Sequence, residues 1–213
     1  MNPGQGIVIF GDVVHSRRDP TGSSTWLRSL SDELQAACGT EILAPFGFTQ
    51  GDELQGLLRH NADPIGVVLR AALGPANRRM RWAIALGAVD PGAGPATQRT
   101  GEAFLAARAA LLENRRQRSS LRIVTGDPNS DGLLDDLAPV LGRAIDDLTP
   151  AQRRVARLIL VDGLRRSEVA DRLGVSRATV SVTADRAAVP SLERLVRAVR
   201  TLVARSRPAG WES

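Results

Sequence analysis

The chain has 213 residues, 43% of them hydrophobic and 24% charged, which suits one large or two modest domains with a buried core. All 28 basic residues are arginine, and the absence of lysine and tyrosine excludes lysine Schiff bases, P-loop lysines and tyrosine nucleophiles. Two histidines and the single Cys38 exclude a structural zinc site and an internal disulfide. We see no export signal and no apolar run of about 18 residues, so we expect a cytoplasmic protein without a membrane span.

Strand and helix patterns alternate along the first 125 residues. Short apolar or alternating runs predict strands, and apolar residues three and four apart predict helices. The expected elements are a strand at 7–10, a helix around 26–34, a hairpin of 46–50 and 54–58, a helix at 62–74, a strand at 81–89, a helix at 101–117 and a strand at 121–125. This order predicts an α+β fold with a mixed, largely antiparallel sheet backed by helices.

Three carboxylates occupy conspicuous places in that pattern. Asp12 follows the first apolar strand, and Asp52 with Glu53 lies at the tip of the hairpin. If the first strand lies beside the hairpin, these acids meet at one edge of the sheet. Carboxylate oxygens are the ligands that Mg²⁺ prefers, so the acids are candidate metal ligands. Asp and Gly are also ordinary turn residues, which leaves a purely structural interpretation open.

A segment dense in turn formers, GDPNSDG at 126–132, marks the end of the first domain. Beyond it, apolar residues repeat at near-heptad spacing despite Pro139, and they are Leu134, Leu137, Leu141, Ala144 and Leu148. This stripe is either a dimer seam or the first helix of a DNA-binding core. We therefore predict a domain at 1–128, a linker helix at 129–148 and a helical domain at 149–213.

The last third of the chain predicts four short helices and carries the positive charge. Residues 145–213 contain 13 arginines and 8 acids, which accounts for the whole net charge of +5 and is the pattern expected of a nucleic-acid-binding segment. Thr149 and Gln152 form a capping-box pattern, with Pro150 in the first turn. We expect helices from there to about residue 163, at 167–173, at 177–188 and at 192–206, with a break at Pro190-Ser191.

The stretch LTPAQRRVARLILVDGLRRSEVADRLGVSRATVSV resembles the DNA-binding domains of LuxR-type regulators and the promoter-binding region of sigma factors. The resemblance implies a helix–turn–helix whose second helix, beginning at Arg177, enters the major groove of double-stranded DNA, usually as a homodimer. Arg153 and Arg154 would suit the flanking phosphate backbone. The candidate DNA contacts are Ser176, Arg177, Thr179, Ser181, Arg186, Arg165 and Arg166.

Four motifs of the first domain resemble the SatD family: GDVVHSRR (11–18), GDELQGLL (51–58), RWAIALGAV (81–89) and GEAFLAAR (101–108). The layout also resembles the palm domain of GGDEF proteins and nucleotide cyclases. That resemblance implies Mg²⁺ on Asp12, Asp52 and Glu53, and a nucleotide whose phosphates lie on Arg17, Arg18 and Arg108.

The sequence departs from these patterns at several places. A single glycine precedes the acid pair, Leu54 replaces the phenylalanine, and Gly101-Glu102 stands where the SatD family has Asp-Gly. No residue is a candidate nucleophile, so nucleotide binding is favoured over turnover.

Three functions fit these observations. We favour a transcription regulator whose first domain senses a nucleotide with Mg²⁺. The alternatives are a cyclase or nucleotidyltransferase tethered to DNA, and a ligand-free dimeric DNA-binding regulator.

Overall fold

In the computed structural model, which describes residues 4–16, 19–49, 52–76 and 78–207, one five-stranded sheet organises the N-terminal part. The strand order is β2-β3-β1-β4-β5. β1 pairs antiparallel with β3 and β4, β2 pairs antiparallel with β3, and β4 pairs parallel with β5, which confirms the mixed, largely antiparallel sheet. The strands are β1 (Gly4–Val13), β2 (Ile42–Phe48), β3 (Glu53–Leu58), β4 (Met80–Val89) and β5 (Leu121–Val124).

Helices cover both faces of this sheet, as the alternation of side chains along β1 requires. Ile7 and Ile9 belong to a large core that also contains apolar residues of α1 (Pro20–Cys38) and α2 (Pro64–Ala72). Val8 and Phe10 point the other way, into a smaller core under α3 (Glu102–Gln117). Two short 3-10 helices, η2 (Gly39–Glu41) and η3 (Ala96–Gln98), lie in the connections.

A long helix, α4 (Pro128–Asp146), leads from the sheet to the C-terminal helices. It packs on β5 and on the last helix, α8 (Val189–Arg205). The near-heptad stripe faces the protein's own core, since Leu134, Leu141 and Leu148 are buried. The interpretation of this stripe as a dimer seam is therefore wrong. Burial of the stripe offsets the backbone hydrogen bond that Pro139 removes and the steric conflict of its ring with the preceding turn, so the helix continues through this residue.

The three helices between α4 and α8 are α5 (Pro150–Leu160), α6 (Arg166–Leu173) and α7 (Arg177–Arg186), close to the predicted ranges. The capping box of α5 is present, with hydrogen bonds between Thr149 and Gln152 in both directions. The break expected at Pro190 is displaced. Pro190 lies in the first turn of α8, where its missing N–H leaves no bond unmade, and the chain turns instead at Ala188 with φ 49°.

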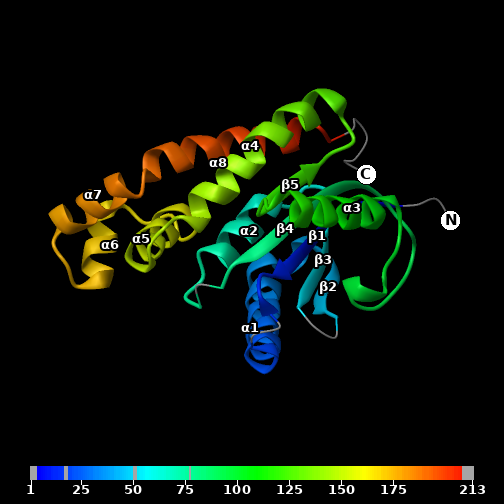
Figure 1. Ribbon diagram of the computed structural model, residues 1–213, viewed down its shortest axis with the longest axis horizontal. Coiled ribbons are helices and arrows are strands. Elements are labelled where there is room, and N and C mark those ends of the chain that lie inside the picture. The colour runs from blue at the N-terminus through cyan, green and yellow to red at the C-terminus, as the bar shows by residue number, and fades with distance from the viewer. Residues whose placement is uncertain (1–3, 17–18, 50–51, 77, 208–213) are drawn as a thin grey trace.

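The C-terminal helices are not packed as a separate body. One continuous apolar cluster runs from Ile84 of the sheet through Leu141 of α4 to Val155, Ala170 and Val196 of the helices. Figure 1 shows α4 and α8 as a two-helix arm that carries α6 and α7 at the end farthest from α3 and β2. Within the described ranges, no helix combines the length and the apolar character needed to cross a membrane.

Candidate functional site

Helices α6 and α7 form a helix–turn–helix. Gly174 ends α6 in the left-handed conformation, with φ 65° and ψ 34°, which a glycine adopts without the steric penalty of a side chain. Val169 and Ala170 of α6 and Val180 and Ala184 of α7 are buried together, at the end of the continuous apolar cluster described above. The small side chain of Ala170 permits the close crossing that this motif requires. The predicted helix–turn–helix geometry is therefore present.

The N-terminal end of α7 is capped and faces solvent. The Ser176 Oγ accepts a hydrogen bond from the Thr179 backbone N–H at 3.1 Å. The side chains of both residues are also hydrogen-bonded to each other at 2.8 Å. Arg177 and Arg186 are exposed, and neither forms an ion pair with any residue in the described part of the chain. Ser176 and Thr179 thus fix the start of the helix, while the two arginines remain available to a ligand.

The other predicted DNA contacts differ in their surroundings. Ser181 is half-buried, and Arg165 is exposed just before α6. Arg166 forms an ion pair with Asp185 at 2.9 Å, which joins the start of α6 to the end of α7. Arg153 is only 6% exposed and donates to backbone carbonyls, so its predicted place on the DNA backbone is wrong.

Two exposed apolar residues beside these polar groups were missed by the sequence reasoning. Val175 in the turn is 42% exposed and Val182 on α7 is 49% exposed. Apolar side chains of this kind contact thymine methyl groups in the major groove. Helical periodicity could have predicted the exposure of Val182, because Val182 does not lie on the helix face that carries Val180 and Ala184.

The acids of the first domain do meet at one edge of the sheet. Asp12 on β1 lies opposite Glu53 on β3 and opposite Arg81 on β4, so the three form a row across adjacent strands. Asp12 is 3% exposed and Glu53 6% exposed. The Val13 backbone N–H donates to the Asp52 carbonyl at 2.9 Å, which places the hairpin tip beside the end of β1.

Arginines of α3 already neutralise these carboxylates. Arg115 donates from Nη2 and Nε to the two oxygens of Asp12, at 2.6 and 3.1 Å. Two turns earlier, Arg108 makes a two-pronged pair with Glu53 and lies 4.7 Å from the centre of the Phe10 ring. The Asp12 carboxylate raises the pKa of Arg115 above its ordinary value. Arg115 escaped the sequence reasoning, although its seven-residue spacing from Arg108 placed it on the same face of the helix.

This arrangement bears on the predicted ligands. Asp52 accepts a hydrogen bond from the Ser16 hydroxyl, and the oxygens of Asp12 and Glu53 are occupied by arginine. Across the described ranges, no group of three or more acids, histidines or cysteines is placed to hold a metal ion. With their oxygens paired in this way, Asp12, Asp52 and Glu53 do not form a Mg²⁺ site. Binding of Mg²⁺ after these pairs are broken stays a prediction. Arg17 and Arg18 lie outside the described residues.

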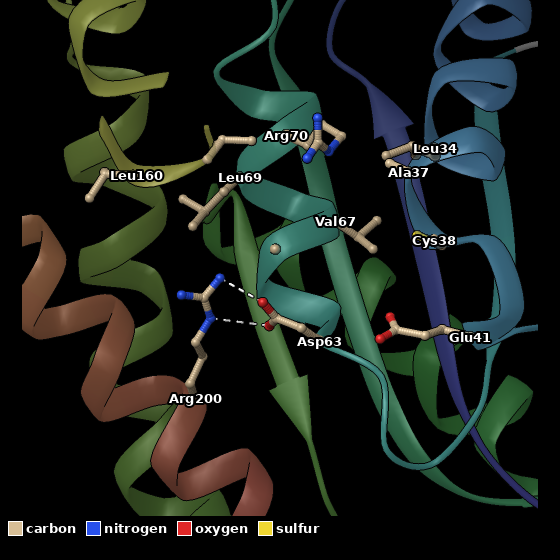
Figure 2. A pocket seen from close by; sticks show the side chains of 12 residues that line it. Leu34, Ala37, Cys38, Glu41, Asp63, Val67, Leu69, Arg70, Leu160 and Arg200 are labelled. Carbon is tan, nitrogen blue, oxygen red and sulfur yellow. Dashed lines mark hydrogen bonds and ion pairs between the residues drawn. The ribbon is translucent and has the colours of Figure 1, made fainter. Parts of the chain in front are cut away.

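A second feature, which we call the seam, is the contact of α5 and α8 with α1 and α2. Figure 2 shows one part of it, where Arg200 of α8 makes a two-pronged pair with Asp63 at the start of α2, at 2.6 and 3.1 Å. Elsewhere on the seam, Arg157 of α5 pairs with Glu33 of α1 at 2.7 Å. The helical module is therefore attached to the sheet domain by apolar packing and by arginines.

Residues 140–188 match the family model described as Sigma-70, region 4. The matched segment begins inside α4 and contains α5, α6 and α7, the helices that build the helix–turn–helix. The match supports a DNA-binding regulator. No curated protein sequence is significantly similar to this chain.

The N-terminal part is similar in fold to solved structures of bacterial light-regulated adenylyl cyclases. One match has 16% identity and a TM-score of 0.41, and it covers 58% of this chain and 77% of the other. A second has 15% identity and a TM-score of 0.40, and it covers 58% of this chain and 44% of the other. Likeness at this level supports no statement about activity. The SatD resemblance stays a prediction.

Proposed function

We propose that this protein is a transcription regulator that binds double-stranded DNA by inserting α7 into the major groove. The observation that carries the proposal is the capped α7 at the free end of the arm, within the segment matched by Sigma-70 region 4. Arg177 is the first base-contacting candidate because it follows the cap directly, where recognition helices meet base edges. Arg165 and Arg186, both exposed, are candidates for phosphate contacts.

The test begins by selecting a binding site from random duplexes and then measuring affinity by fluorescence anisotropy. A protein with about five phosphate contacts should show a log–log slope of affinity against salt near −4 to −5. Arg116→Ala, which removes one positive charge from the exposed surface of α3, is the control for any arginine substitution in the helix–turn–helix. The proposal fails if affinity does not depend on salt, or if no duplex is enriched by the selection.

We further propose that the edge formed by Asp12, Glu53, Arg108 and Arg115 senses an anionic ligand, with a nucleoside triphosphate as the first candidate. The specific observation is that the side chains of Arg108 and Arg115 are each 44% exposed although both are paired. Phosphate oxygens compete with carboxylates for the same two-pronged geometry of arginine. For the ligand to control DNA binding, it must bind the DNA-competent and the incompetent arrangement with different affinity.

The sensor proposal is tested by measuring DNA binding with and without each nucleoside triphosphate, in the wild type and in Asp52→Asn. An effect of nucleotide that the substitution alters supports sensing. Product formation that depends on Mg²⁺ and disappears in Asp12→Asn would favour the tethered enzyme instead. Stable dimers whose DNA affinity changes neither with nucleotide nor with Asp52→Asn would favour the ligand-free regulator.

A further inference from the structure

A cavity of about 390 Å³ lies on the seam, between α5 and the segment that follows α2. Three arginines of α5 line it, and they are Arg153, Arg154 and Arg157. Its remaining wall is largely apolar and includes Leu73, Pro75 and Pro150, and Glu33 is the one acid among the described lining residues. The volume falls within the range of about 300–1,000 Å³ that is typical of small-molecule sites.

The positive charge of this cavity is not balanced. Arg157 is paired, since it donates to Glu33 at 2.7 Å and to the Arg70 carbonyl at 2.9 Å. Arg154 is exposed and makes no ion pair with any residue that the structure describes. Among the described residues, the cavity lining thus contains three guanidinium groups and a single carboxylate.

Arg153 is the buried member of the three, and its guanidinium group is only partly hydrogen-bonded. It is 94% buried, with an exposed fraction of 6%. Its terminal nitrogens donate to the carbonyls of Ala72, just at the end of α2, and Ile145, in the last turn of α4. Its Nε has no hydrogen-bond partner among the described residues, and no acid there is within ion-pair distance. Helix C-termini stabilise a cation, but only partly offset the desolvation of a buried charge.

Burial also lowers the pKa of the Arg153 guanidinium below its ordinary value, and the charge of nearby Asp146 offsets this only in part. An anion in the cavity would place a further negative charge beside Arg153. Phosphate suits it well, because guanidinium groups bind phosphate oxygens in a two-pronged way. The apolar wall formed by Leu73, Pro75 and Pro150 leaves room for a non-polar body attached to the phosphate.

We propose that this cavity binds a small phosphate monoester with a flat or apolar body, of the size of a nucleoside monophosphate. The phosphate lies on Arg153, Arg154 and Arg157, and the body lies against the prolines. The site is separate from the edge that contains Arg108 and Arg115.

Binding at this cavity acts on the attachment of the DNA-binding helices. Arg153 and Arg157, one helical turn apart, hold α5 to the carbonyls of Ala72 and Arg70 at the C-terminal end of α2. A bound phosphate competes with these carbonyls and with Glu33 for the same donors. The ligand therefore changes how firmly the helix–turn–helix is held to the sheet domain, which couples the cavity to DNA affinity.

The test uses isothermal titration calorimetry of the full chain with adenosine 5′-monophosphate, adenosine and inorganic phosphate. We expect the monophosphate to bind, phosphate to bind more weakly and adenosine not to bind. Arg154→Gln should weaken monophosphate binding about tenfold, because it removes a charge-assisted contact. Arg154 is exposed and has no structural partner among the described residues, so this variant should fold.

Two controls decide the outcome. Arg116→Gln removes the same charge from a remote exposed site and should leave monophosphate affinity unchanged. Arg115→Gln alters the sheet edge proposed above to sense a nucleotide, so a loss of monophosphate binding in this variant and not in Arg154→Gln would assign the monophosphate to that edge. The proposal is overturned if Arg154→Gln behaves like Arg116→Gln, if adenosine binds as tightly as its monophosphate, or if only Arg115→Gln abolishes binding. It is equally overturned if the monophosphate does not bind, and weaker DNA binding by Arg154→Gln would then assign Arg154 to the DNA backbone.

Discussion

Arginine has different surroundings at the two ends of this molecule. At the sheet edge, Arg108 and Arg115 are locked to the buried carboxylates of Glu53 and Asp12. On α7, Arg177 and Arg186 are exposed and form no ion pair within the described ranges. The same side chain therefore balances buried charge in one region and remains free for a charged partner in the other. The two cases differ because buried acids lie beside Arg108 and Arg115, whereas no acid of the described residues lies within ion-pair distance of Arg177 or Arg186.

The largest effect should follow from breaking a locked pair. Arg115→Ala leaves Asp12, which is 3% exposed, with the weaker contact of Arg81 at 3.5 Å as its one remaining ion pair among the described residues. We expect the free energy of unfolding in urea to fall by about 2–3 kcal/mol, at the low end for a buried pair because Arg115 is half-exposed. Arg116→Ala should change it by less than about 0.5 kcal/mol. Equal losses in the two variants would contradict the locked-pair interpretation.

The next effect concerns the free arginines. Arg177→Ala should weaken specific DNA binding by about 1–3 kcal/mol, or roughly ten- to hundredfold, while leaving the free energy of unfolding nearly unchanged. Anisotropy with the selected duplex and with a scrambled duplex separates two roles. A loss confined to the selected duplex indicates a base contact, and an equal loss on both indicates a phosphate contact. If Arg177→Ala binds both duplexes as tightly as the wild type does, Arg177 does not contact DNA.

A smaller effect tests the turn that presents α7. Gly174→Ala forces a side chain into the left-handed conformation at φ 65°, which should lower the free energy of unfolding by about 1 kcal/mol. Gly132, inside α4 with open space around it, is the matched control. Gly132→Ala should instead stabilise the protein by about 0.5–1 kcal/mol. Thermal unfolding of both variants measures these two changes in stability. A change of the same sign in both variants would contradict the assigned role of Gly174.

The last test uses the wild-type protein and measures how accessible Cys38 is to an alkylating reagent at the seam. Burial, with a contribution from Glu41, raises the pKa of the Cys38 thiol to about 11. Because the thiolate is the reactive form, alkylation by iodoacetamide at pH 8 should be at least about a hundredfold slower in the folded chain than in urea. The folded rate should keep rising towards pH 11. Equal rates in both states would mean that this part of the seam opens readily.

Much of the local structure could be predicted because it depends on neighbours in the sequence. The capping box of Thr149 and Gln152, the glycine turn at 174 and the apolar run of β1 are all short-range patterns, and the structure confirms them. The meeting of Asp12 with the hairpin acids also followed from strand order. Pro190 was misplaced because a proline favours a helix start as readily as a chain break, and only the packing of α8 separates the two.

The sequence by itself determined the strand and helix order, the helix–turn–helix and the chemistry that the composition excludes. Tertiary structure alone decided which arginines are free. Arg153 and Arg154 are adjacent in the chain, yet one is 94% buried and the other is exposed, since successive helix positions lie about 100° apart and only one faces α2. Likewise, Arg115 is bound to Asp12 across 103 positions of sequence. Pairing over such distances depends on how α3 lies on the sheet, which no local pattern records.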